Sequence, residues 1–307
     1  MMGLLKAEVR RFESRRALRG LGISLLALCF LYGAYAYLQH PRLPKSVEVK
    51  RNELLAQVDA GKAASIGRCQ RGFRQPPEFD IPPQTKDECE REWSEYLAST
   101  DKDRFHFSEI RKLFVSLGLP LAFLGWFIGA TFIGADWHSG SLATTLTWEP
   151  RRFRLLLAKA IACAGMIFTI VYVLLTLLLV ALLPVANFKG TFHGVDADWW
   201  TATALTAGRV ALVSGMFGLI GFSIAALARN TAAAVGLAFG YFLIDGFARS
   251  TERLDPWLLV ENLEGVVSSS LGLGAAYSTL QATGLLIVYS ATAFVMAGIL
   301  LIYRDVA

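Results

Sequence analysis

Polar and charged side chains gather in one short segment of this chain, residues 134–159, with the sequence GADWHSGSLATTLTWEPRRFRLLLAK. An acidic residue, Asp136, stands near its start, and arginines at 151, 152 and 154 stand near its end. Guanidinium groups bind carboxylates and phosphates in a fixed geometry. The chemistry that this pattern favours is therefore binding, to a soluble partner or to lipid headgroups, and not catalysis.

Two long uncharged runs enclose this polar segment. Residues 113–135 form a 23-residue run at its start, and residues 160–188 form a 29-residue run after it. An uncharged stretch of about 18 residues or more is long enough to cross the roughly 30 Å hydrocarbon core of a bilayer as a helix. The polar segment is then a connection between two membrane spans, and its arginines place it on the cytoplasmic side.

The rest of the chain repeats this apolar pattern. Of its 307 residues 54% are hydrophobic, above the share usual in soluble domains. None of the apolar runs alternates strictly, as strands of a membrane barrel do. We therefore predict an all-α polytopic membrane protein with six transmembrane helices. The predicted spans are residues 21–38, 113–135, 160–185, 203–228, 231–248 and 282–303.

The first twenty residues combine a basic character with an apolar stripe. The apolar residues that can share one helical face are Leu4, Leu5, Val9 and Phe12. This spacing predicts an amphipathic helix over residues 1–20 at the cytoplasmic membrane surface, with Arg10 and Arg11 as headgroup anchors. A disordered basic tail is the alternative. Because the basic residues flank membrane runs, the net charge of +5 does not indicate a nucleic-acid partner.

Residues 39–109 form a hydrophilic block without any run that could cross a membrane. One crossing from a cytoplasmic N-terminus places this block outside, as a small external domain. Its proline-rich centre, residues 74–85, must be irregular or extended, and its flanks, 46–66 and 87–99, have the composition of helices. Residues 249–281, rich in glycine and serine, predict a second external segment: a loop, a surface helix or a re-entrant piece.

Two cysteines, Cys69 and Cys89, fall in the external block. On the oxidising side of a membrane they could close a loop of about 20 residues by a disulfide, worth roughly 3 kcal/mol by chain entropy. A pair of free thiols is the alternative. No histidine stands at a ligand-like spacing from either cysteine, so we expect no metal site.

Few ionisable residues fall inside the predicted spans. Arg209 and Asp245 are the two such residues. A charged side chain within a membrane span is a candidate functional residue, and the alternative is that each residue only marks a helix end. They could pair between the fourth and fifth spans. A Gly125–Gly129 motif in the second span permits close helix approach, and Pro184 is expected to end the third span.

Motifs for chemistry on bound nucleotides or acyl groups are missing from the sequence. The Gly61-Lys62 pair is followed by Ala63, and Ala56 stands where a P-loop has its first glycine. There is no G-x-S-x-G elbow, and no histidine lies in a predicted span. We therefore expect a chain without catalytic residues or a cofactor of its own.

The polar connection has its own predicted structure. Gly140 can end the helix that leaves the membrane, and Ser141 can cap the next helix. Residues 141–148 then form a short interfacial helix, which Pro150 ends because it disfavours helical geometry at Glu149. The alternative is an ordinary amphipathic loop that only anchors the membrane.

The connection resembles the corresponding region of ABC exporter permeases of the ABC-2 type. In that family an acidic residue stands four positions before a Gly-Thr or Gly-Ser pair; leucines, a proline, arginines and a basic residue opening the next span follow. The matching residues here are Asp136, Gly140, Ser141, Leu142, Leu146, Pro150, Arg151, Arg152 and Lys159. Asp and Ser replace the commoner Glu and Thr. Close motif identity covers about 25 residues, whereas the six-span plan resembles the family over most of the chain.

The resemblance implies an exporter subunit in the cell membrane with both termini in the cytoplasm. It implies a dimer with itself or a related permease, and two cytoplasmic ABC ATPase subunits that bind ATP and Mg. The residues implied in ATPase coupling are Asp136, Gly140, Ser141, Leu142, Leu146, Glu149, Pro150, Arg151 and Arg152, with Lys159 as a further membrane anchor. The chief rival is a non-transporting membrane sensor with an external domain; a membrane-embedded enzyme lacks a catalytic constellation.

Overall fold

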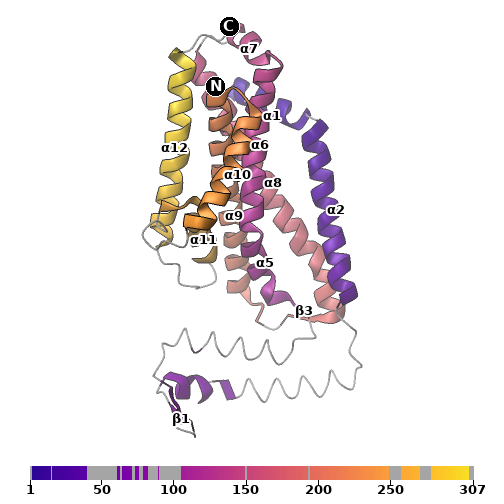
Figure 1. Cartoon of the computed structure of the whole chain (residues 1–307). Helices are drawn as coiled ribbons and strands as arrows, with labels where there is room; N and C mark the ends of the chain where they lie inside the picture. Colours follow the sequence, from indigo (N-terminus) through magenta and orange to yellow (C-terminus); the bar gives the residue numbers. More distant parts are fainter. Residues whose placement is uncertain are drawn as a thin grey trace. The chain divides into compact units, whose positions relative to one another are not determined.

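Helices dominate the computed structural model (Figure 1). The residues that it describes are 2–14, 16–39, 61–62, 64–70, 73–75, 79–81, 89, 105–148, 151–192, 194–248, 257–269 and 278–303. Contacts divide the chain into two units, one made of residues 1–31, 108–180 and 194–307, the other of residues 32–107 and 181–193. The helices are α1 (Met2–Ser14), α2 (Arg16–Gln39), η1 (Phe107–Glu109), α5 (Ile110–Ser116), α6 (Gly118–His138), α7 (Ser141–Trp148), α8 (Arg152–Lys189), α9 (Ala197–Ala228), α10 (Thr231–Ala248), α11 (Leu259–Ser268) and α12 (Thr279–Tyr303).

Among the described residues, five helices are long and apolar enough to cross a membrane: α6, α8, α9, α10 and α12. They correspond to five of the six predicted spans. The sixth predicted span, residues 21–38, falls within α2, whose residues Cys29–Leu38 are a shorter apolar helical stretch. The expected fold class, an all-α polytopic membrane protein, is thereby confirmed.

Helices α6 and α9 form the centre of the larger unit. We compare the most apolar 18-residue stretch of each helix. The buried share of that stretch is 61% in α6 and 67% in α9, but only 17% in α10. Glycines bring the two central backbones together: a Cβ at Gly125 would overlap the carbonyl oxygen of Ser214, and one at Gly129 would overlap that of Gly218. The Gly125–Gly129 motif therefore serves a contact within the chain, as small residues commonly do between membrane helices.

Aromatic side chains connect the central pair to α10. Phe123 of α6 meets Phe217 of α9 and Phe242 of α10, with ring centroids 6.3 and 5.4 Å apart. The indole Nε1 of Trp126 donates to the carbonyl oxygen of Ala234, 3.1 Å away. This bond satisfies a polar atom where no water is available. Helix α12 packs on α9, and α11 contacts α5, α6, α9 and α12.

Helix boundaries differ from the expected ones in α8 and α9. Helix α8 continues through Pro184 to Lys189, because one missing backbone donor is tolerated in a long helix within the membrane. Helix α9 begins at Ala197, where the Asp196 carboxylate accepts a bond from the Trp199 N–H at 2.6 Å. Within residues 249–281, α11 is a helix with one buried face, which includes Val260 and Leu263.

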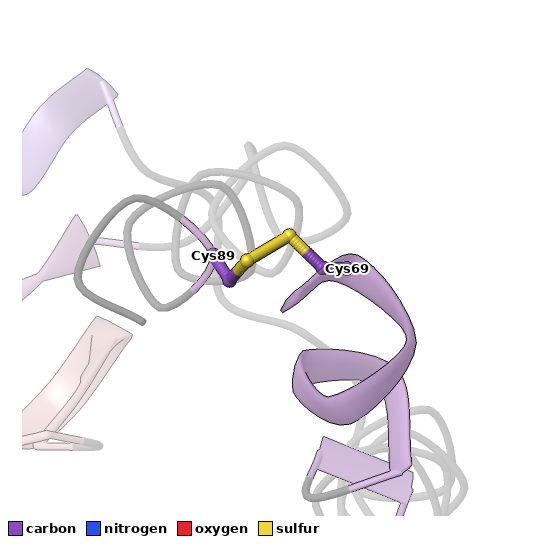
Figure 2. The surroundings of a disulfide bond; sticks show 2 residues. All are labelled: Cys69 and Cys89. Carbon is purple, nitrogen blue, oxygen red and sulfur yellow. A yellow bond between two sulfur atoms is a disulfide. The ribbon is translucent and has the colours of Figure 1, made fainter. Parts of the chain in front are cut away.

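The smaller unit contains the short strands. Strand β1 (Phe73–Gln75) pairs antiparallel with β2 (Phe79–Ile81), so the described residues of the expected irregular or extended centre, 74–85, are extended. Strand β3 (Phe105–His106) pairs parallel with β4 (Gly190–Thr191). A disulfide joins Cys69 and Cys89 (Figure 2), which is the bridged alternative of the sequence analysis. Most of the predicted flanking helices, 46–66 and 87–99, lies outside the described residues.

Candidate coupling site

The turn between α6 and α7 depends on Gly140. Its φ of +66° lies in the left-handed region, which glycine adopts without a Cβ clash. Its N–H donates to the Trp137 carbonyl at 3.2 Å, and its own carbonyl accepts from the Thr144 N–H at 3.4 Å. Gly140 thus closes α6 and opens α7, as the sequence suggests.

Ser141 has a different role from the one expected. It is the first residue of α7, so the position before the helix belongs to Gly140, and the Ser141 Oγ donates to Oδ1 of Asp136 at 3.2 Å. Because the acceptor is a carboxylate, this bond is charge-assisted and stronger than a bond between neutral groups. Ser141 therefore fixes the orientation of Asp136.

A buried ion network connects Asp136 to two other helices. The Nζ of Lys159, in the first turns of α8, donates to Oδ2 of Asp136 at 2.7 Å and to Oε2 of Glu8 in α1 at 2.8 Å. All three residues are buried, with exposed fractions of 0% for Lys159, 3% for Asp136 and 2% for Glu8. The network therefore joins α1, the end of α6 and the start of α8 at one point.

The surroundings of this network strengthen it. Arg11 Nη1 lies 3.4 Å from the other carboxylate oxygen of Glu8, so two cations face two carboxylates. The Lys159 Nζ also lies 5.7 Å from the centroid of the Phe132 ring, and Phe12 packs on that ring at 5.3 Å. Charge interactions gain strength in such an apolar setting, but removing one partner leaves the others buried without compensation.

The membrane anchors predicted from the sequence need correction. Lys159 does not reach lipid headgroups, because its side chain is enclosed by α1 and α6. The Arg11 guanidinium forms an ion pair with Glu8, whereas Arg10 is exposed. Arg152 Nη1 donates to the carbonyls of Leu301 and Ile302 at 3.1 and 3.4 Å. It thereby binds the last turn of α12, where a cation is favourable.

Of the two leucines that the resemblance implies in ATPase coupling, Leu142 is not available for such a contact. Leu142 is 2% exposed and belongs to the core of the chain, because α7 folds back against α6. Leu146 is half-buried, and Thr144 and Thr147 form the exposed side of the helix. Arg151 is exposed, whereas Glu149 and Pro150 lie outside the described residues.

Two residues near the site were missed by sequence reasoning. Glu8 stands four positions after Leu4 and four before Phe12, so a carboxylate interrupts the apolar stripe of the N-terminal helix. A carboxylate on the apolar face of a helix indicates that a cation from another part of the chain pairs with it. Arg229, at the end of α9, lies over the Trp137 ring at 4.8 Å; only the tertiary structure brings them together.

The possible pair of Arg209 and Asp245 is not formed: in the described part of the chain, no ion pair joins the two residues. Arg209 donates to Ser269 Oγ at 2.9 Å, and Asp245 is buried near the end of α10. The pKa of Arg111 in α5 is lowered, first by burial and then by the positive charge of Arg209. Arg209 therefore lies close to α5. Each residue therefore belongs to a different local environment.

Comparison with known proteins agrees with this architecture. The model of the ABC-2 family transporter protein family matches residues 2–249. That match includes α1, the turn at Gly140 and the whole ion network. No curated protein and no solved structure matches the chain in these comparisons. A family model covers most of the chain, so the chain belongs to the ABC-2 transporter family and is a multi-pass membrane component of a transporter.

Proposed function

We propose that this chain is the membrane-spanning subunit of an ATP-driven exporter. It works as a dimer, with itself or a related permease, and with two separate cytoplasmic ABC ATPases that bind ATP and Mg. The observation that carries the proposal is the Lys159 network, which ties α1, α6 and α8 together directly beside α7. A contact at α7 would thereby act on three helices at once.

The exposed side of α7 is the proposed contact with the ATPase. Thr144 and Thr147 lie on it one turn apart. Force applied there reaches Asp136 through Ser141, and reaches α8 through Lys159. Helix α8 has 38 residues and, at 1.5 Å per residue, is about 57 Å long. It is long enough to carry a displacement from the coupling site through the whole bilayer.

We propose six spans in total, with α2 as the first. Its 24 residues correspond to about 36 Å, enough for the hydrocarbon core. Both termini and residues 136–158 are then cytoplasmic, in the cell membrane, and residues 39–109 form an external domain. The Cys69–Cys89 disulfide supports this assignment, because disulfides persist on the oxidising side of a membrane.

Labelling of single cysteines in intact cells tests this topology. In a background without the native cysteines, an impermeant maleimide should modify a cysteine at position 60 and spare one at position 147, which should react only after permeabilisation. The reason is that the bilayer shields the cytoplasmic side. Efficient labelling at position 147 in intact cells, with none at position 60, would reverse the orientation.

Purification together with an ATPase tests the function itself. We expect a tagged copy of the chain, expressed with a differently tagged second copy and a candidate lone ABC ATPase, to retain both. The ATPase should be present at two subunits for each pair of permease copies. ATP hydrolysis by the complex should exceed that of the isolated ATPase. A chain that purifies as a monomer and retains no ATPase would favour the rival function, a membrane sensor.

A further inference from the structure

A cavity of about 550 Å³ opens beside the last turns of α10. Its apolar walls come from Leu119 at the start of α6 and from Phe242, Leu243 and Phe247 of α10. Its volume lies in the range of small-molecule sites, which are mostly apolar with a few polar groups in defined places. The polar groups here are two carboxylates, and neither takes part in the coupling site.

The two carboxylates come from different helices. Asp245 of α10 is 2% exposed, and Glu264 of α11 lies at the more accessible side. A carboxylate has about four acceptor positions, so each can serve an added donor or cation beside its contacts within the chain. Asp245 lies in the last turn of α10, where the helix dipole adds negative potential. Among the residues that the structure describes, the lining includes two carboxylates and no lysine, arginine or histidine, so this part of the wall is acidic.

Hydrogen bonds hold the walls of the cavity in place. The hydroxyl oxygen of Tyr241, one turn before Asp245, accepts from the Leu259 N–H at 2.7 Å and so fixes the start of α11 against α10. The Tyr289 hydroxyl of α12 donates to the Trp257 carbonyl at 3.0 Å, just before α11. Positioned walls limit the ordering cost when a ligand binds.

We propose that this cavity binds a lipophilic cation, an organic cation with apolar or aromatic substituents. The faces of Phe242 and Phe247 attract positive charge, and the carboxylates offset it in a setting of low polarity. The apolar walls bury the substituents. Ca²⁺ or Mg²⁺ would need six or more oxygen ligands, more than two carboxylates in an apolar cavity supply, and an anion would be repelled. The site does not depend on the proposed export function.

Binding of a matched pair of probes tests the proposal. Tetraphenylphosphonium and tetraphenylborate have the same shape and apolar surface but opposite charge. The purified full chain in phosphatidylcholine nanodiscs should bind radiolabelled tetraphenylphosphonium saturably, above the uptake of protein-free discs. Tetraphenylborate should show no such saturable component. Equal saturable binding of both probes would identify a site for apolar molecules in general, such as acyl chains, and would overturn the proposal.

Variants separate the charge from the shape of the cavity. Asp245→Asn keeps the side-chain volume, and we expect it to weaken phosphonium binding at least fivefold, with a further loss in Asp245→Asn/Glu264→Gln. Gly246 lines the cavity, and no atom lies within 4 Å of its Cβ position. Gly246→Phe should therefore fill the space and abolish binding. Gly236→Phe, at an equally open position of α10 outside the cavity lining, should leave binding unchanged. Phosphonium binding that is absent from the wild type, or unaffected by both Asp245→Asn and Gly246→Phe, would contradict the proposal.

Discussion

Replacing Lys159 by methionine should destabilise the protein more than any other single change of a charged residue discussed above. The substitution leaves Glu8 and Asp136 buried beside each other without their shared cation, at a cost of about 3–5 kcal/mol. We expect the thermal midpoint of the purified protein to fall by on the order of 10 °C. We also expect trypsin to cleave faster at the basic residues of α1, because α1 loses its bond to α8.

Two comparisons show whether the lost charge balance is the cause. Glu8→Gln/Asp136→Asn/Lys159→Met removes all three charges together and should recover at least half of the lost stability, since no carboxylate stays buried without a cation. Lys112→Met removes a lysine from the exposed pair with Glu109 and should change stability by no more than about 0.5 kcal/mol. The ion network would have no structural importance if Lys159→Met and Lys112→Met were equally mild in both assays.

Gly129→Ala is the second change with a large expected effect. An added Cβ would overlap the backbone oxygen of Gly218, and a backbone cannot rotate away as a side chain can. Helices α6 and α9 must therefore separate along the centre of the larger unit. Overpacking of this kind costs about 1–3 kcal/mol or more, and we expect a lower thermal midpoint and less monodisperse protein after solubilisation.

Gly208→Ala is the matched control for this prediction. Gly208 lies in α9 as well, but no atom lies within 4 Å of its Cβ position. Alanine has the higher helix propensity by about 1 kcal/mol, so this variant should be as stable as the wild type or slightly more stable. If Gly129→Ala also melted at the wild-type temperature, the close approach of α6 and α9 would be refuted.

Hydrophobic patterning predicted the architecture well. Five of the predicted spans correspond to helices, and the turn at Gly140 and the short helix after it lie where their residue types indicated. These features depend on local properties: the length of an uncharged run, the freedom of glycine at positive φ, and the spacing of polar residues. The disulfide was one of two alternatives because both cysteines fell in one hydrophilic block.

Partners distant in sequence could not be predicted in this way. Lys159 stands at the edge of an apolar run, where a headgroup anchor and a buried cation have the same sequence pattern; its bond to Glu8, 151 positions away, decides between them. Leu142 and Leu146 share a helical face, but only the packing of α7 on α6 shows that Leu142 is enclosed. Charge and position left a pair of Arg209 and Asp245 possible, whereas the structure gives Arg209 a bond to Ser269.

The central claim, that α7 receives the ATPase, is tested most directly by copurification of the ATPase with a variant of the exposed α7 face. Thr144→Arg/Thr147→Arg adds bulk and charge on that face without touching the buried Leu142 or the Lys159 network. Thr201→Arg changes an exposed threonine in the first turns of α9 and serves as the control.

We predict that Thr144→Arg/Thr147→Arg keeps the wild-type membrane level and thermal midpoint but retains at least tenfold less ATPase, equivalent to about 1.4 kcal/mol of binding free energy. Thr201→Arg should retain the wild-type amount. Recovery of the ATPase at wild-type stoichiometry with the α7 variant would contradict the claim.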